Sequence, residues 1–438
     1  MDEDILDSVF RAYDIRGMYP DQIDDQFAFE LGLAFSKYFL PEDVFVVRDT
    51  RDSGESLKKL LMKGIVQTGR DVVDGGVMST PQAYHAMQET DYDAGIIITA
   101  SHNPEGYNGF KLMREDGEPV SGEKGGKAIK NIMKEKTFTY HDEEGEIIEE
   151  NNDDEYKSFL EGIFRKVEGL EMVVDKSNGS AHTEIQFLKD RFPRLTVLNE
   201  EENGFNHEPD PTSKESKETL RKAIDEEDAE LGVLFDGDGD RTIFIDEEGE
   251  EIRPDIAACI FMDYLSGDTI VQDPRSTKYL EEKAEETGKS VVMSKAGRTN
   301  MIEHMMENEA SFGVEGSGHY FYESFGYLDC PMMALRDLLL AYEDEERFSD
   351  LRKKNTKYFH SGEHNFEVND SQAGLETVRN EYNDAQKMLF IDGISVYEDD
   401  YWFNIRESNT QPLLRVNLEA DDKETMDEKL RDISELLS

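Results

Sequence analysis

Short apolar runs alternate with amphipathic segments along most of this chain, and this alternation limits the folds that it can adopt. The apolar run at 44–47 precedes a segment, 55–68, whose large apolar residues recur at helical spacing. Two further apolar runs, at 71–77 and 95–100, enclose a second helical segment. Strands that alternate with helices predict an α/β sheet with crossover helices.

The alternation recurs twice more and then changes. An acid-rich stretch at 137–155 follows the first round, the second round ends at DGDGDR (236–241), and the third begins near Arg253. Near 345–355 the composition becomes charged again, and the remainder reads as a mixture of strands and helices. We therefore expect three α/β domains followed by a smaller C-terminal α+β domain, at residues 1–145, 146–247, 248–350 and 351–438.

The chain is strongly acidic. Its 438 residues include 99 Asp and Glu against 48 Lys and Arg, which gives a net charge of −51. Such a charge argues against a nucleic-acid-binding protein and against a partner of anionic membranes. Because the acidic residues are spread along the chain, we interpret the protein as one adapted to concentrated salt. An acidic protein without that adaptation is the alternative.

The sequence leads us to expect neither a signal peptide nor a membrane span. The first residues are acidic rather than basic, and no apolar run reaches the roughly 18 residues of a membrane span. The two cysteines, Cys259 and Cys330, belong to no motif with metal-ligand spacing. These features predict a cytoplasmic protein.

The apolar run at 95–100 leads directly into Ser-His-Asn-Pro at 101–104. A tight turn at this place would expose the hydroxyl of Ser101. Lys111 follows shortly afterwards and can return to the same place as a general acid or base. Taken singly, such features are more often an ordinary polar turn and a surface lysine.

The segment DGDGDR places three carboxylates at alternate positions, Asp236, Asp238 and Asp240. Glycines between them let the backbone curl, so that the carboxylates can converge on one hard cation. An EF-hand loop is an alternative, but Arg241 stands where its glycine should be and the flanks look like strands. Arg241 beside a cation indicates an anionic ligand such as a phosphoryl group. A solvated acidic turn is the remaining alternative.

A glycine-rich segment at 313–319 contains Glu315, Ser317 and His319. A carboxylate and a hydroxyl are suited to hydrogen bonds with adjacent hydroxyls of a sugar. The imidazole can titrate near neutral pH. A glycine-rich turn with a structural histidine is the alternative.

Two further segments carry groups that suit a phosphate. The segment RESNTQP offers a guanidinium fork and several donors, from Arg406, Ser408, Asn409 and Thr410. The segment FRAYDIRG adds Arg11, Tyr13 and Arg16 near the start of the chain. For this second segment, a strand with ordinary surface arginines is the alternative.

These motifs, in this order and with one in or beside each expected domain, resemble those of the α-D-phosphohexomutase superfamily, most closely its phosphomannomutase/phosphoglucomutase branch. The resemblance covers nearly the whole chain. It implies four domains around a central cleft, the first three with mixed sheets. It also implies an isomerase that interconverts the 1-phosphate and 6-phosphate of mannose or glucose, through a phosphoserine and a hexose 1,6-bisphosphate.

The resemblance further implies which residues act. Mg²⁺ is expected at Ser101, Asp236, Asp238 and Asp240. The expected catalytic set is Ser101, Lys111, Arg16, His102 and His319, with Lys111 as general acid/base and Arg16 or His319 as alternatives. The expected substrate-binding set comprises Tyr13, Arg11, Arg241, Arg275, Arg298, Glu315, Ser317, Arg406, Ser408, Asn409 and Thr410. We therefore expect a locally positive cleft within a negative surface.

Some positions depart from the pattern of the branch. Arg298 stands where the branch often has His, Arg275 where a lysine can serve, and Val47 and Val314 where Gly is common. Both arginines remain cationic, so these departures affect the expected sugar preference more than phosphate binding. Phosphoglucosamine mutases more often carry SGT in the last motif, and Asn409 argues against that alternative. A non-catalytic acidic cation-binding protein is a further alternative. The expected partners are hexose phosphates, not nucleic acid or membranes, and the chain would be a monomer or small homo-oligomer.

Overall fold

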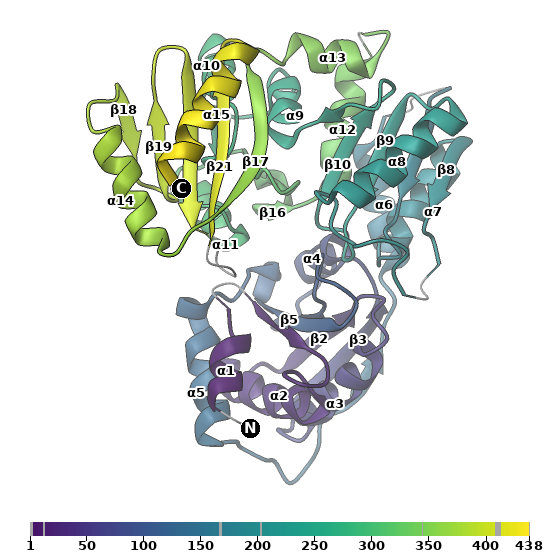
Figure 1. The fold of residues 1–438 in the computed structure, drawn as a ribbon. Coiled ribbons are helices and arrows are strands. Elements are labelled where there is room, and N and C mark those ends of the chain that lie inside the picture. The colour runs from purple at the N-terminus through teal and green to yellow at the C-terminus, as the bar shows by residue number, and fades with distance from the viewer. Residues whose placement is uncertain are drawn as a thin grey trace. The chain divides into compact units, whose positions relative to one another are not determined.

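The computed structural model describes residues 3–11, 14–165, 169–201, 204–343, 345–407 and 413–437. The chain forms two compact units, Met1–Glu251 with Ser317–Glu343 and Ile252–Gly316 with Asp344–Ser438, here called unit 1 and unit 2. Its elements are labelled in Figure 1.

The first sheet of unit 1 is mixed, with the strand order β1-β5-β4-β2-β3-β6. β2 pairs in parallel with β3 and β4, whereas β5 pairs antiparallel with β1 and β4. Its strands are β1 (Ile15–Met18), β2 (Asp43–Arg48), β3 (Asp71–Val77), β4 (Ala94–Ile98), β5 (Tyr107–Arg114) and β6 (Ile147–Glu149). Its helices are α1 (Glu3–Val9), α2 (Asp25–Phe39), α3 (Gly54–Val66), α4 (Thr80–Glu89) and α5 (Lys127–Glu135), with short turns η1 (Glu115–Gly117) and η2 (Gly122–Gly126).

Helices α2 and α3 cross at very short distance. A Cβ on Gly64 would lie 2.2 Å from the carbonyl oxygen of Phe29, and a Cβ on Gly32 would lie 2.4 Å from that of Leu61. Asp24 begins α2 as its N-cap and accepts a hydrogen bond from the amide of Phe27 at 2.7 Å. The two glycines therefore allow the backbones to approach where any side chain would separate them.

The second sheet of unit 1 has the order β11-β10-β9-β7-β8. β7 pairs in parallel with β8 and β9, and β10 returns antiparallel to β9. The strands are β7 (Glu171–Asp175), β8 (Arg194–Leu198), β9 (Leu231–Phe235), β10 (Thr242–Asp246) and β11 (Glu251–Ile252); the helices are α6 (Asp153–Ile163), α7 (His182–Arg191) and α8 (Lys214–Glu227). Unit 1 also contains the antiparallel pair β15 (Tyr320–Tyr322) and β16 (Leu328–Asp329), the turn η3 (Glu323–Phe325) and helix α12 (Pro331–Tyr342).

Unit 2 begins with a parallel arrangement in which β12 lies between β13 and β14. These strands are β12 (Thr269–Gln272), β13 (Ser290–Met293) and β14 (Phe312–Val314), and the helices of this part are α9 (Pro254–Phe261), α10 (Lys278–Glu286), α11 (Arg298–Glu307) and α13 (Phe348–Lys354). The last sheet is antiparallel, with the order β17-β21-β20-β19-β18. It consists of β17 (Phe359–Glu367), β18 (Lys387–Leu389), β19 (Ile394–Tyr397), β20 (Tyr401–Glu407) and β21 (Leu413–Ala420), with helices α14 (Ser371–Glu381) and α15 (Lys423–Leu437).

Alternate residues of the last sheet form its core. Phe403 and Ile405 of β20 are fully buried, as is Val416 of β21. They pack in one cluster with Val378 of α14 and Ile433 of α15. Both helices therefore cover the same face of the sheet, as Figure 1 shows.

The expected fold class is confirmed: α/β parts with both parallel and antiparallel pairing precede an α+β part with an antiparallel sheet. The helices expected near 182–191 and 214–227 are α7 and α8. The four domain boundaries stay predictions, and residues 317–343 cluster with unit 1 rather than with the rest of the stretch 248–350.

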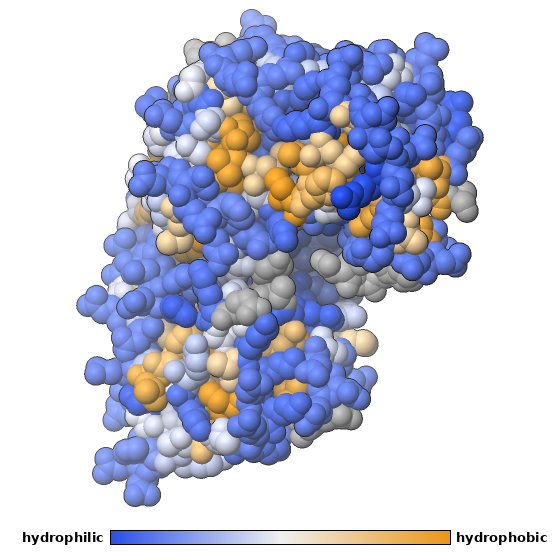
Figure 2. All heavy atoms as spheres, turned by 90° about the vertical axis from the view of Figure 1, so that its left-hand side faces the viewer, coloured by the Kyte–Doolittle hydropathy of each residue, from blue (hydrophilic) through white to orange (hydrophobic). Residues whose placement is uncertain are grey.

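The face drawn in Figure 2 is mostly hydrophilic, with separate hydrophobic patches. This agrees with acidic residues that are spread along the sequence. Among the helices of the described residues, none has the length and apolar character needed to cross a bilayer.

Candidate active site

Ser101 lies in a tight turn directly after β4. Its φ angle is 51°, in the left-handed region that non-glycine residues seldom adopt. Its amide donates to Oγ1 of Thr99 at 2.8 Å, and its Oγ donates to Oδ2 of Asp236 at 2.9 Å. A Cβ on Gly237 would lie 2.6 Å from the carbonyl oxygen of Ser101. The serine turn and the DGDGDR turn therefore touch.

The three alternate aspartates, Asp236, Asp238 and Asp240, lie between β9 and β10 and are fully buried. One carboxylate oxygen from each lies within 4.8 Å of those from the others. Gly239, with φ 71°, lets the turn close. Strands flank the turn on both sides, so the EF-hand alternative is excluded.

Lys111 of β5 enters the same cluster. It is buried, and its Nζ donates to carboxylate oxygens of Asp238 and Asp240. Burial alone would lower the pKa of Lys111, but the two carboxylates outweigh burial and raise that pKa above its ordinary value. Burial, followed by repulsion from the other two carboxylates, raises the pKa of Asp236 well above its ordinary value.

The donor set fits a small hard cation. Oδ1 of Asp238 and Oδ1 of Asp240 are buried, and neither accepts a hydrogen bond from the described part of the chain. Together with Asp236 and the hydroxyl of Ser101, they offer oxygen ligands only. Mg²⁺ prefers such ligands, whereas zinc sites normally include sulfur or imidazole nitrogen.

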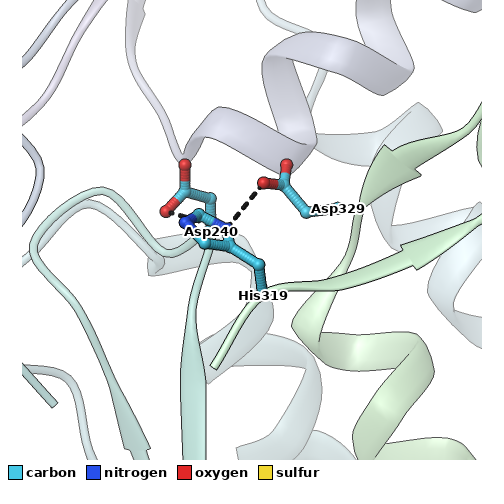
Figure 3. A group of neighbouring side chains, drawn as sticks. All are labelled: Asp240, His319 and Asp329. Atoms are coloured by element: carbon cyan, nitrogen blue, oxygen red, sulfur yellow. Dashed lines mark ion pairs between the residues drawn. The ribbon is translucent and has the colours of Figure 1, made fainter. Parts of the chain in front are cut away.

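His319 lies beside this cluster, between two polar partners. Its Nδ1 is 2.7 Å from Oδ2 of Asp329 and 3.9 Å from Oδ1 of Asp240, as Figure 3 shows. Its Nε2 accepts a hydrogen bond from Nε of Arg241 at 2.9 Å. Because an arginine already donates to Nε2, we interpret the three residues of Figure 3 as a polar network and not as a second metal site.

The sequence did not predict Asp329 as a residue of the site. It lies on β16, which pairs with β15, the strand that begins directly after His319. The pairing of these two short strands returns Asp329 toward His319. The only signal in the sequence is a carboxylate ten residues after the histidine, which is too common a feature to single out.

Two more predicted residues lie beside Ser101. Oγ of Ser101 and Nδ1 of His102 are 3.3 Å apart. Burial, with the positive charges of Arg241 and Arg16, lowers the pKa of His102 well below its ordinary value, so its imidazole is neutral at pH 7. Arg16 of β1 donates to Oδ1 of Asn103 in the serine turn.

Arg11 is exposed. Four predicted residues lie outside the described residues, namely Tyr13, Ser408, Asn409 and Thr410. Ser317 belongs to unit 1 and follows the segment that carries Glu315 in unit 2.

Unit 2 holds a second group of predicted residues. Glu315 follows β14, is buried, and accepts a hydrogen bond from the amide of Gly297, which precedes Arg298 at the start of α11. Arg275 binds the carboxylate of Asp273, with its Nε 3.0 Å from Oδ1. The loops after β12, β13 and β14 thus supply these residues, at the carboxyl ends of parallel strands.

Arg406 belongs to a cationic cluster in unit 2. Of this cluster, the sequence predicted Arg406 and Arg275 only. Its Nη2 donates to Oε2 of Glu363 at 2.9 Å, and Nη1 of Arg415 donates to Oε1 at 3.1 Å. Burial opposes ionisation of Glu363, but Arg406, Arg415 and Arg275 together lower its pKa. Three guanidinium groups around one carboxylate form a suitable environment for a phosphate. Arg415 and Glu363 were missed because they lie outside the RESNTQP segment.

Models of known protein families match most of this chain. Four family models match in order: phosphoglucomutase/phosphomannomutase alpha/beta/alpha domains I, II and III and the C-terminal domain. The residues that they match are 7–140, 154–249, 253–359 and 363–436.

Similar proteins include phosphomannomutases and a solved structure of the same family. The chain is 36% identical over 446 residues to a phosphomannomutase from Methanocaldococcus jannaschii, which covers 98% of this chain and 97% of the relative. It is 32% identical over 452 residues to a phosphomannomutase from Vibrio cholerae, with 98% of each covered. A solved phosphoglucomutase/phosphomannomutase family protein from Burkholderia thailandensis has a TM-score of 0.90 at 28% identity and covers 98% of this chain and 97% of its own.

Proposed function

Since the chain belongs to the phosphoglucomutase/phosphomannomutase family and is a phosphohexomutase, we propose that it interconverts the 1-phosphates and 6-phosphates of mannose and glucose through a phosphoserine at Ser101. One observation carries the assignment of Ser101. Its hydroxyl lies 2.9 Å from Asp236, in a buried cluster of three aspartates and Lys111. An exchangeable phosphoryl group at this hydroxyl would lie beside both a cation site and a protonated amine.

We assign the metal to the three aspartates, with an oxygen of phosphorylated Ser101 as a further ligand. Mg²⁺ bound there would neutralise negative charge on the transferring phosphoryl group. The buried oxygens of Asp238 and Asp240 that accept no hydrogen bond from the described residues support this assignment.

The reaction has two matching transfers. In the first, the bond between phosphorus and Ser101 Oγ breaks as a new bond forms to the 6-oxygen of a hexose 1-phosphate. The hydroxyl proton of the sugar passes to a base, and the released Oγ takes up a proton. The resulting hexose 1,6-bisphosphate turns around in the site. In the second, its 1-phosphoryl group returns to Ser101 Oγ, whose hydroxyl proton passes to a base, and the released 1-oxygen takes up a proton. The net result is a hexose 6-phosphate and a rephosphorylated enzyme.

We assign the proton transfers to Lys111. It is held beside the reacting serine by Asp238 and Asp240, which keep it protonated in the free cluster, where it can donate a proton. A cation that neutralises these two carboxylates would remove the cause of the raised pKa and let the amine accept a proton. His319 is the second candidate. Its Nε2 accepts a hydrogen bond from Arg241, so this nitrogen carries a lone pair that can take up a proton. His102 is neutral and lies against Ser101, so it serves as a hydrogen-bonding neighbour of the phosphoryl group.

We assign substrate binding mainly to the residues of unit 2. Glu315 and Ser317 would bind hydroxyls of the sugar, and Arg275, Arg298 and Arg406 would bind the phosphate that does not react. The lowered pKa of Glu363, caused by the arginines around it, supports a strongly cationic environment there. Arg11 and Arg241, with Tyr13, Ser408, Asn409 and Thr410, complete the proposed binding set.

A coupled assay tests this function. The parent protein should form hexose 6-phosphate from mannose 1-phosphate and glucose 1-phosphate, with Mg²⁺, hexose 1,6-bisphosphate and concentrated salt present. Ser101→Ala should abolish turnover and phosphoenzyme formation, whereas Ser56→Ala, a serine that bonds to Asp25 on α2, should retain both. No isomerisation of either substrate by the parent would overturn the proposal. Turnover with glucosamine 1-phosphate alone would instead assign glucosamine phosphate as the substrate.

The acidity of the chain supports a proposal about its environment. A net charge of −51 creates strong self-repulsion that concentrated salt would screen, so we propose adaptation to a salt-rich cytoplasm. The chain would act there as a monomer or small homo-oligomer.

A further inference from the structure

Arg51, three residues after β2, uses every donor of its side chain. It is buried, and its guanidinium has five N–H groups. Nη2 donates to the carbonyl oxygens of Ser101 and Asn103 at 2.8 and 2.5 Å. Nη1 donates to those of Pro104 and Tyr107 at 2.8 and 2.9 Å, and Nε donates to Oδ2 of Asp49 at 3.1 Å.

Four of these five acceptors belong to the turn that carries Ser101. Within that turn, the amide of Asn103 donates to Ala100 and the amide of Tyr107 donates to Pro104, each at 3.0 Å. A left-handed backbone is unfavourable for serine, because its Cβ comes too close to the following carbonyl oxygen. The turn therefore depends on contacts from outside itself to keep Ser101 at φ 51°.

Arg51 is itself held firmly. Asp49 accepts from the amide of Arg51 at 3.0 Å through Oδ1, in addition to its bond with Nε. The ring of Phe205 lies 5.0 Å from Cζ of Arg51, which places an aromatic face against the guanidinium. The guanidinium is thus a fixed planar template, and the carbonyl groups of the turn are arranged around it.

We propose that Arg51 is a positioning residue for phosphoryl transfer: its guanidinium fixes the turn 101–107 so that Oγ of Ser101 faces the aspartate cluster. The inference rests on the proposed role of Ser101 as phosphoryl carrier. Lysine at this position would keep the charge, but its three donors radiate from one nitrogen and cannot match four carbonyl groups in a plane. Geometry, and not charge alone, is therefore the property that Arg51 supplies.

The test compares Arg51→Lys with Arg48→Lys, a neighbouring arginine that bonds to Glu55 and to the carbonyl of Asp49. Because small misplacement of a reacting group costs roughly 100-fold, kcat of Arg51→Lys should fall by about that factor while KM changes little. Arg48→Lys should keep the parent kcat. Hydrogen exchange of peptides that cover 99–107 should accelerate in Arg51→Lys, with exchange in α2 unchanged.

A kcat of Arg51→Lys within about threefold of the parent would overturn the proposal. If that variant does not fold, Asp49→Asn gives a milder test, because it weakens the anchor of Nε and should thereby loosen the four bonds of the guanidinium to the turn. Parent-like kcat and parent-like exchange in Asp49→Asn would also overturn it. If Ser101→Ala kept normal turnover, the proposed function itself would fail, and exchange at 99–107 would still report separately whether Arg51 holds the turn.

Discussion

Nδ1 of His319 faces Oδ2 of Asp329 at 2.7 Å, while Nε2 of the same ring accepts from Arg241. An accepting Nε2 places the ring proton of a neutral His319 on Nδ1, toward the carboxylate. Arg241 therefore sets the tautomer of His319, and the carboxylate of Asp329 holds the Nδ1 side of the ring by its charge.

Replacing Asp329 by Asn should keep the shape of the site and lose this control. We expect kcat to fall by about 10- to 100-fold, the order found when a residue that orients a functional histidine is removed. Asp337→Asn, which alters a buried aspartate on α12 bonded to Tyr322, is the matched control and should retain kcat. Equal losses in the two variants would mean that Asp329 acts only on stability.

Removal of metal should stop turnover, and Asp238→Asn should raise the Mg²⁺ concentration needed for half-maximal activity by at least about tenfold, because one charged ligand is lost. Thermal unfolding gives an independent readout: Mg²⁺ should stabilise the parent but not this variant. Asp246→Asn, at the other end of β10, is the control because its side chain accepts from the amides of Glu248 and Glu250. Unchanged Mg²⁺ dependence in Asp238→Asn would remove it from the ligand set.

Glu184 makes unit 1 sensitive to pH. Its Oε1 accepts from the hydroxyl of Ser79, and burial raises the pKa of Glu184 from 4.5 to about 7. The folded state therefore binds the proton more tightly than the unfolded state. The stability that this proton provides is complete below pH 4.5 and is lost as the pH rises to about 7.

Glu184→Gln imitates the protonated side chain. It should remove the pH dependence between those values and increase the free energy of unfolding at pH 8 by up to about 3 kcal/mol. The exposed Glu218→Gln on α8 should change neither quantity. Denaturant unfolding at several pH values measures both, and a destabilised Glu184→Gln at pH 8 would contradict the expectation.

The crossing of α2 and α3 gives a prediction about stability. Gly64→Ala forces a methyl group to within 2.2 Å of the carbonyl oxygen of Phe29, so it should lower the free energy of unfolding by about 1–3 kcal/mol. Gly162→Ala on α6 meets no atom within 4 Å and should be neutral or slightly stabilising, by up to about 1 kcal/mol. Similar effects of the two substitutions would show that the crossing can relax.

Salt should also control stability. Lowering the ionic strength removes the screening of the 51 excess negative charges, so the midpoint of thermal unfolding should fall steeply between molar and millimolar salt. Circular dichroism across a series of potassium chloride concentrations measures it. A midpoint that stays constant across the series would contradict adaptation to concentrated salt.

The sequence predicted the parts of the site that are contiguous. Ser101 and the alternate aspartates stand in short loops after apolar strands, where residue type and spacing already limit the chemistry. Asp329, Arg51 and Arg415 could not be found in this way. Each acts through a partner brought close by sheet pairing or by a turn from another segment, so its role appears only when the fold is known.

The contact between Gly237 and the carbonyl oxygen of Ser101 has a consequence for protein engineering. A Cβ at Gly237 would come within 2.6 Å of that oxygen, so each loop sets the space available to the other. A chimera that takes its serine loop from one relative and its aspartate loop from another must therefore bring a compatible pair. Recombination between relatives should succeed more often when both loops come from the same parent.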